Sequence, residues 1–333
     1  MRDRLLLIAT FLLLTLLACT EPAAPPTATI ANPIVTVPSA DTGGDGYPES
    51  GYPTGQTAAI DRNTTWPLFA GDMLFHSGRL GDISLFKMSG ATGEYTRLPV
   101  GRNAFEPEYS PDCSQIIYTG TLDNGRFGLF VSDADGNNSR AVVQSDAGGD
   151  AYGATWSADG SQIAYMLLEN ARIDVCVANP DGSAERCMAQ PGMNNANPAF
   201  SADGNMLIFT SNRDGDWEVF STPTSDLSAN RQLTNNTYND LRPRVSSADR
   251  IVYDASPTGQ YDIYTMNLDG GDVRQITTDS TDDTAADWLN DQILFTSLRS
   301  LEGDIYLINS DGTNLTRLTN ELGSDSEPTY CAP

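Results

Sequence analysis

Side chains with oxygen donors recur in this 333-residue sequence at nearly regular intervals. Two glutamates, two asparagines and three aspartates fall three or five residues before a set of spaced apolar residues, which we call the anchors. Carboxylate and amide oxygens are the ligands that a hard cation such as calcium prefers. If the fold brings these positions to one centre, they form a polar binding site. The candidates are Glu106, Asn197, Asp240, Arg242, Asp283, Asp325 and Glu327.

This set of residues leaves two interpretations open. The carboxylates could hold calcium, but Arg242 would bring a positive charge among the ligands. A hydrated polar channel explains the same pattern without any metal. We therefore assign no cofactor, and calcium is the one that the pattern allows.

Residues for nucleophilic catalysis are scarce. The single histidine is His76, at the end of an expected strand where the other copies hold Thr, Met or Asp. We therefore interpret His76 as an ordinary rim residue. The sequence has no G-x-S-x-G elbow, so a serine hydrolase triad is hard to assemble. We assign no catalytic residue.

An internal repeat must position the candidate residues. The anchors are separated by 47, 44, 45, 43 and 42 residues, and they are Tyr109, Trp156, Phe200, Val245, Trp288 and Tyr330. A polar turn follows most of them, then a strand such as MLIFTS, a glycine-containing loop, a third strand and a short fourth. Four copies have Asp-Gly before the fourth strand, which suits a tight hairpin. A period of about 40–45 residues with four strands per unit is typical of propeller blades.

The sequence therefore predicts an all-β fold, a six-bladed β-propeller of four-stranded antiparallel blades. The first copy begins near Asp72 without its innermost strand, and the segment 327–331 supplies the missing one. The C-terminal strand should therefore close the ring by joining the N-terminal blade. The innermost strands should carry the candidate residues to a central funnel, the default site for a ligand.

The repeat resembles the TolB-type, WD-like propeller repeat, whose pattern is P-x-x-S-P-D-G, S-x-R-x-G-x-x-D-I-Y, N-x-D-G and L-T. The closest matches are PEYSPD at 107–112, PAFSADG at 198–204, DIYTMNLDG at 262–270 and DIYLINSDG at 304–312. The resemblance extends from Asp72 to the C-terminus. It implies the fold but not the ligand, because such propellers have many roles. Calcium-dependent lactonase-like propellers use a polar centre, so the resemblance is also consistent with an enzyme.

Four cysteines other than Cys19 indicate two disulfides. Cys176 and Cys187 flank an Asn-Pro-Asp-Gly turn on neighbouring strands, where they can bridge. Cys331 lies at the exit of the innermost strand of the shared blade, and Cys113 replaces the turn glycine of the next blade. We predict that these two also form a bridge. The sequence has no C-x-x-C pair and no Cys/His cluster, so zinc is not indicated.

The N-terminal segment reads as a bacterial lipoprotein signal. Two arginines precede an apolar run that is too short to cross a membrane, and Leu16-Leu17-Ala18-Cys19 resembles a lipobox. We expect a signal peptide at 1–18, lipidation of Cys19, and a Pro/Thr/Gly-rich tether at 19–65. The propeller should then occupy 66–333. An ordinary signal peptide or an uncleaved anchor is the alternative.

Charge limits the partners. The net charge is −25, and residues 66–333 contribute 16 − 38 = −22. Such an acidic surface repels phosphate backbones, which excludes nucleic acid and leaves cationic or neutral partners.

These features together predict a lipid-anchored protein of the bacterial cell envelope with a monomeric head. We expect the propeller to bind a protein, peptide or glycan. The alternative is a calcium-dependent, lactonase-like hydrolase, and a structural or sensor role in the envelope is a third possibility.

Overall fold

The computed structural model describes residues 68–101, 103–144, 148–188, 192–300, 302–320 and 323–331, and the backbone of 57–58. These residues belong to one compact unit, Ser50–Pro333. The expected signal peptide (1–18), Cys19 and most of the expected tether (19–65) lie outside the described residues. Within the described part of the chain, no helix is long and apolar enough to cross a membrane.

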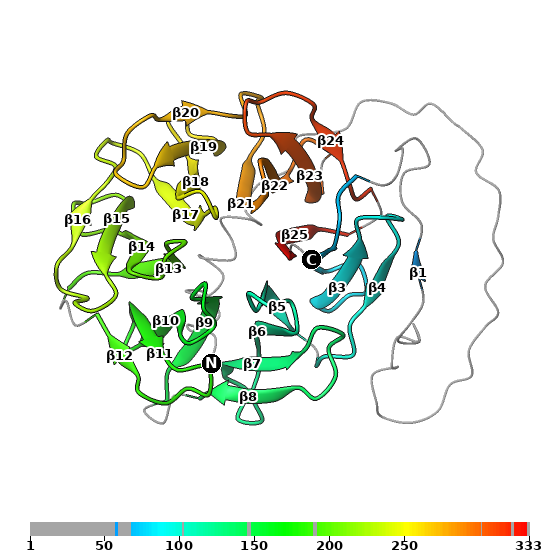
Figure 1. The fold of residues 1–333 in the computed structure, drawn as a ribbon, viewed down its shortest axis with the longest axis horizontal. Helices are drawn as coiled ribbons and strands as arrows, with labels where there is room; N and C mark the ends of the chain where they lie inside the picture. The colour runs from blue at the N-terminus through cyan, green and yellow to red at the C-terminus, as the bar shows by residue number, and fades with distance from the viewer. Residues whose placement is uncertain are drawn as a thin grey trace, which may run out of the picture. The chain divides into compact units, whose positions relative to one another are not determined.

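Six antiparallel sheets follow one another around a ring (Figure 1). Blade 1 contains β1 (Thr57–Ala58), β2 (Asp72–Ser77), β3 (Ser84–Ser89), β4 (Tyr95–Arg97) and β25 (Asp325–Cys331). Blade 2 contains β5 (Phe105–Tyr109), β6 (Gln115–Thr121), β7 (Phe127–Asp133) and β8 (Arg140–Val143). Blade 3 contains β9 (Asp150–Trp156), β10 (Ile163–Glu169), β11 (Arg172–Ala178) and β12 (Arg186–Cys187).

The other three blades repeat the same order. Blade 4 contains β13 (Asn195–Phe200), β14 (Met206–Ser211), β15 (Glu218–Pro223) and β16 (Arg231–Gln232). Blade 5 contains β17 (Asp240–Val245), β18 (Arg250–Ala255), β19 (Asp262–Asn267) and β20 (Arg274–Gln275). Blade 6 contains β21 (Asp283–Leu289), β22 (Gln292–Ser297), β23 (Asp304–Asn309) and β24 (Thr316–Arg317). The predicted fold is confirmed.

Turns after the innermost strands explain part of the repeated motif. In blade 3 the Ser157 hydroxyl donates to Asp159 at 2.7 Å, and the Ser161 amide donates to the same carboxylate at 3.0 Å. Hydrogen bonds from the amide of Ser161 and the hydroxyls of Ser157 and Ser161 lower the pKa of Asp159 to about 2. The aspartate therefore stays ionised and holds its own turn.

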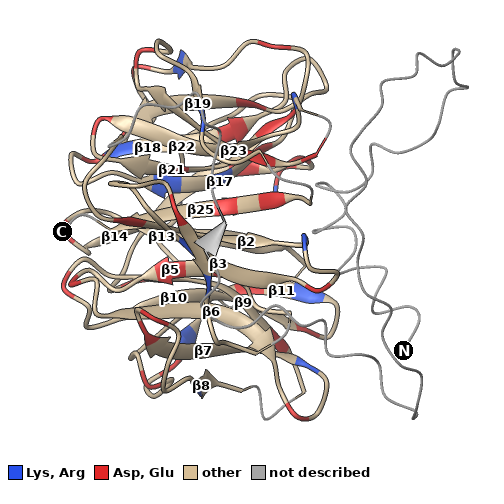
Figure 2. Cartoon of the chain, turned by 90° about the vertical axis from the view of Figure 1, so that its right-hand side faces the viewer, with Lys and Arg blue, Asp and Glu red and all other residues tan. Residues whose placement is uncertain are grey.

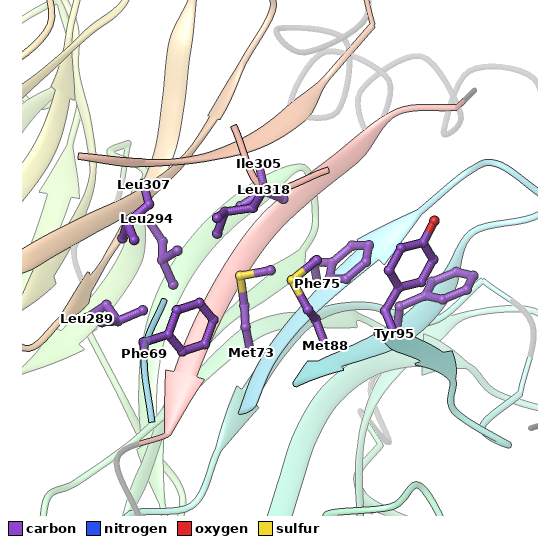
Figure 3. Close-up of a cluster of buried hydrophobic side chains, with 11 residues drawn as sticks. Phe69, Met73, Phe75, Met88, Tyr95, Leu289, Leu294, Ile305, Leu307 and Leu318 are labelled. Atoms are coloured by element: carbon purple, nitrogen blue, oxygen red, sulfur yellow. The ribbon is translucent and has the colours of Figure 1, made fainter. Parts of the chain in front are cut away.

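Apolar side chains fill the spaces between neighbouring blades. A cluster between blades 6 and 1 shows the pattern (Figure 3). Its members from blade 1 and the segment before it include Phe69, Met73, Phe75, Met88 and Tyr95, and those from blade 6 are Leu289, Leu294, Ile305, Leu307 and Leu318. Because one blade cannot bury both of its faces, this packing holds the ring together.

Strand β25 closes the ring. It pairs antiparallel with β2, and Asp72 lies opposite Cys331. Both predicted disulfides are present: Cys113 bonds to Cys331 with their Cα atoms 5.8 Å apart, and Cys176 bonds to Cys187. The first of these ties blade 1 to blade 2. Blade 1 also has a fifth strand, β1, which pairs with β4, so part of the expected tether joins this sheet.

Candidate functional site: the central pocket

Each innermost strand is interrupted at the same place by a bulge. The pairing register shifts there in all six blades. The residue at this point always has a positive φ, between 50° and 56°; the six are Glu106, Gly153, Asn197, Arg242, Ala285 and Glu327. Bulges bend a strand and redirect a side chain. Five of the six are not glycine, and such backbone positions persist only where the surroundings enforce them.

Proline follows the bulge in four of the six blades. Pro107, Pro198, Pro243 and Pro328 each follow a bulge residue directly. Proline has no N–H to donate to a sheet ladder, so within sheets it is found at edges and bulges. The proline of the P-x-x-S motif therefore occupies a position where a ladder hydrogen bond is already missing.

All six bulge residues line one central pocket with a cavity volume of about 40 Å³. The other residues that line it are Pro107, Glu108, Met166, Arg244, Ala286, Pro328 and Thr329. Pockets for small organic ligands usually measure about 300–1,000 Å³. This pocket has room for a few water molecules, a single ion or one polar end group, because one water needs roughly 10–15 Å³.

Glu327 and His76 form an ion pair at the wall of the pocket, with His76 Nδ1 3.2 Å from Glu327 Oε2. Burial alone lowers the pKa of His76, but the Glu327 carboxylate outweighs it, and the pKa is raised above the usual value. Burial likewise opposes ionisation of Glu327, yet His76, Arg242 and Arg244 lower its pKa. Each side chain therefore favours the charged form of the other, a contact that the sequence interpretation of His76 as an ordinary rim residue missed.

Unlike Glu327, two other glutamates of the pocket have a raised pKa. Burial, with the charge of Glu327 added, raises the pKa of Glu106 to about 7, although the Thr119 hydroxyl donates to Glu106 at 2.9 Å. Burial also raises the pKa of Glu108 to about 7. Glu108 accepts hydrogen bonds from the Thr155 hydroxyl at 2.7 Å and the Trp156 amide at 3.1 Å, so it links blade 2 to blade 3.

Arg242 is held by a buried carboxylate. Its Nε lies 2.6 Å from Asp254 Oδ2, and the Ala285 amide donates to the same oxygen at 3.1 Å. Its Nη2 is buried and makes no hydrogen bond to the described residues. The pocket therefore combines carboxylates with a guanidinium that still has a donor to offer.

The residues five positions before the anchors do not line the pocket. Asp283 accepts from Arg299 at 2.7 Å, Asp325 pairs with Arg79, and Asp240 accepts from Asn236 at 2.7 Å. Arg79 and Arg299 are the arginines of the S-x-R motif, and Arg299 also lies over the Tyr306 ring. The expected convergence of all seven candidates is therefore wrong: only Glu106, Asn197, Arg242 and Glu327 meet. The bulge explains this, because it breaks the alternation that would put both rows on one side of the strand.

The donor set of the pocket does not suit calcium. Its carboxylates share the wall with Arg242 and Arg244. Among the described residues, the only group of three potential metal ligands close together is Cys176, Glu185 and Cys187, two of which form a disulfide. Calcium needs about 6–8 oxygen ligands.

Sequence reasoning also missed Glu108 and Arg244. Each directly precedes an anchor and lies two residues after the bulge residue, a spacing that puts both side chains on one face of a regular strand. The available signal was a charged or hydroxyl side chain immediately before five of the six anchors.

A family model described as PD40, TolB beta propeller domain, matches residues 119–300. An uncharacterized protein of Agrobacterium fabrum is 23% identical over 176 residues, covering 50% of this chain and 59% of the relative. A protein TolB homolog of Chlorobium luteolum is 27% identical over 154 residues, covering 46% of this chain and 34% of the relative. The chain therefore spans less than two thirds of either relative.

The crystal structure of TolB from Acinetobacter baumannii has a similar fold, with a TM-score of 0.68 over 79% of this chain and 67% of that one. The sequence identity is 17%, so this likeness concerns the fold alone.

Proposed function

Because this chain belongs to the TolB β-propeller family, as the match over 119–300 shows, we propose that its propeller is a protein-binding module whose partner docks over the central pocket. The observation that carries the proposal is the ring of six bulges. It brings one residue from each of the six blades, four of them with polar or charged side chains, to one small polar space. A partner would place one polar side chain or chain end there and rest the remainder of its surface on the rim.

The size and lining of the pocket favour binding over catalysis. A cavity of about 40 Å³ cannot enclose a lactone or sugar substrate. Pro107 and Pro328 form part of its wall, and these rigid residues narrow the channel. The alternative, a calcium-dependent lactonase-like hydrolase, requires both substrate space and a cation site. A lactone hydrolysis assay with and without added calcium checks it, and we expect no calcium-dependent turnover.

Charge defines the kind of partner. Residues 66–333 carry a net charge of 16 − 38 = −22. In the side view, acidic segments lie in turns on both faces of the ring (Figure 2). Such a field attracts cationic surfaces and speeds their association. We therefore propose a partner protein with a neutral or basic docking surface. Nucleic acid is repelled by the same charge.

The proposed setting is the bacterial cell envelope. The segment 1–18 would direct export, Cys19 would carry lipid, 19–65 would form a tether and 66–333 a monomeric head. The two disulfides support export, because such bonds persist in oxidising compartments. Cys19→Ala tests the anchor: the variant should leave the detergent phase in a phase-separation assay, and a variant that still partitions there would contradict lipidation.

Photo-crosslinking of the full chain in its native membrane tests the docking face. A photoreactive phenylalanine replaces Asn197, which lines the pocket, or Val273, a matched control that is 54% exposed on blade 5. We expect one protein adduct at position 197 that is absent at position 273. Adding Arg242→Glu should abolish it, since this reverses the charge inside the pocket. Identical adducts at both positions, or an adduct that survives the charge reversal, would contradict the proposal.

A further inference from the structure

A second cavity lies between blades 5 and 6, on the face where the innermost strands end. Its volume is about 460 Å³, more than ten times that of the central pocket. This size falls in the range of about 300–1,000 Å³ that is usual for small-molecule sites. Its lining includes Ala248, Arg250, Arg274, Trp288, Asn290 and Asp291.

Shortened turns open this cavity. In blades 2, 3 and 4, six residues separate the anchor from its partner on the second strand, as between Trp156 and Ile163. Blade 5 has five residues between Val245 and Ile251, and blade 6 has four between Trp288 and Ile293. The repeat is therefore interrupted in both blades that border the cavity.

Within the described part of the chain, a hydrogen bond between blades that other interfaces have is missing here. In blades 3 and 4, an arginine of the fourth strand reaches the next blade: Arg186 donates to the Thr224 carbonyl at 2.9 Å, and Arg231 donates to the Asp269 carbonyl at 3.0 Å. The corresponding residue of blade 5 is Arg274, since it pairs with β19 as Arg231 pairs with β15. Arg274 instead donates twice to Asp272 of its own blade, at 3.0 and 3.1 Å.

Glycine contacts show the same difference in spacing. A Cβ atom on Gly182 of blade 3 would lie 2.1 Å from the Val142 carbonyl oxygen of blade 2. A Cβ atom on the equivalent Gly312 of blade 6 would lie 3.1 Å from the Ile276 carbonyl oxygen that follows β20. The backbones of blades 5 and 6 therefore approach each other less closely at this turn.

The lining is polar and balanced in charge. Arg250 donates to Asp272 at 2.8 Å and to the Thr265 hydroxyl at 3.1 Å. Asp272 thus bonds both arginines, and Asp291 lines the same cavity, so two positive and two negative side chains cancel. A strong anion gains little net attraction at such a site, and an apolar ligand would leave these polar groups without partners.

Trp288 adds one aromatic surface to this polar lining. Its indole is half-buried, and its Nε1 is directed to the Arg244 carbonyl oxygen at 3.4 Å. Indole provides a large, rigid contact area at low entropic cost. A ligand that suits this site needs many hydroxyl groups and also an apolar face.

We propose that the cavity between blades 5 and 6 binds an uncharged saccharide of one or two rings. Ring hydroxyls would exchange hydrogen bonds with Arg274, Asn290 and Asp291, and the C–H face of a ring would pack on Trp288. This site is separate from the central pocket and does not depend on the function proposed there.

Saturation-transfer NMR titrations of the full chain with cellobiose, maltose and N,N′-diacetylchitobiose test the proposal. We expect at least one of them to bind with a Kd on the order of 1 mM. Ala248→Trp, an exposed change that blocks the cavity without removing core packing, should weaken binding by about tenfold. Arg274→Ala should weaken it as well.

Matched controls come from the same turn and the same fourth strand of other blades. Ala158→Trp in the exposed turn of blade 3 and Arg231→Ala in blade 4 should leave the Kd unchanged. The proposal is overturned if none of the three disaccharides binds, or if Ala248→Trp binds as tightly as the unchanged protein. Tighter binding of inorganic phosphate than of any disaccharide would also overturn it.

Discussion

The interface between blades 1 and 2 and the one between blades 5 and 6 use the same positions in opposite ways. At the first, the residue after the anchor of one blade, Cys331, is bonded to a turn residue of the next, Cys113. At the second, the equivalent residue Ser246 and the turn residues Asn290 and Asp291 line an open cavity. A repeat fold can therefore change one interface through its turn residues and turn lengths, while the order of strands in the blades is kept.

Breaking the closed interface should have the largest effect. Replacing both Cys113 and Cys331 by serine releases a loop with a sequence separation of 218 residues. The chain-entropy estimate gives a loss of about 5 kcal/mol in the free energy of unfolding. Replacing Cys176 and Cys187, with a separation of 11, should cost about 3 kcal/mol. Urea denaturation of both double variants measures the difference. An equal loss of unfolding free energy in the two would show that the disulfide that closes the ring stabilises the protein no more than the one within a blade.

Replacing two equivalent turn glycines by alanine tests the difference between a tight interface and the open one. Gly182 and Gly312 have nearly the same φ, +84° and +83°, so the strain of a left-handed alanine is shared. Only at Gly182 would the new methyl group overlap a backbone oxygen, that of Val142 at 2.1 Å. We expect Gly182→Ala to cost about 3 kcal/mol and Gly312→Ala about 1 kcal/mol. Similar losses in urea denaturation would contradict the looser packing between blades 5 and 6.

The fold was predictable because the period and the turn chemistry are local. The anchors, the Asp-Gly turns and the incomplete first copy predict six blades and the closing strand. They also predict both disulfides, because the alignment of copies places Cys113 and Cys331 in neighbouring blades. Alignment could not reveal that Thr57–Ala58 joins blade 1, since two residues of backbone pairing leave no pattern.

The candidate site was predictable only in part. The residues three positions before the anchors meet because one bulge recurs in every blade. The residues five positions before the anchors do not meet, because side-chain direction changes across the bulge. Asp283 and Asp325 instead pair with the arginines of the S-x-R motif. The cavity between blades 5 and 6 was visible in principle as two shortened turns, which alignment treats as simple gaps.

The interface between blades 2 and 3, which Glu108 links, should differ from the other two in that its stability depends on pH. Its pKa is raised from 4.5 to about 7, so the folded state holds a proton that the unfolded state has lost between these values. The stabilisation is complete below the unfolded pKa and is lost as the pH rises through about 7. The free energy of unfolding of Glu108→Gln should therefore equal that of the unchanged protein at about pH 5. At about pH 8 it should be larger by about 1 kcal/mol.

Thermal unfolding at the two pH values is the measurement, and 1 kcal/mol corresponds to roughly 2–4 °C. Thr155→Val provides a control, because it removes the hydrogen bond to Glu108 but keeps the titrating group. A constant difference between Glu108→Gln and the unchanged protein across the pH range would contradict the assignment.

The smallest effect compares two alanines with positive φ. Ala171, at 61°, lies in an exposed turn, whereas Ala285, at 52°, is a buried bulge residue of the central pocket. Ala171→Gly should stabilise the protein by about 0.5–1 kcal/mol, since it removes backbone strain. Ala285→Gly should be near neutral, because it also removes a buried methyl group worth about 0.8 kcal/mol. An equal gain at both sites would show that the bulge methyl contributes nothing.

The pairing of β25 with β2 determines when this protein can become complete. Asp72 and Cys331 are opposite each other, yet they are 331 − 72 = 259 residues apart in the chain. Contacts of such separation form slowly, since a long loop must close before they stabilise anything. Until β25 arrives, the edge of β2 stays unpaired and can recruit a strand from another chain. Ring assembly therefore waits until β25 has been synthesised, and aggregation is the competing outcome that a cell must suppress during that interval.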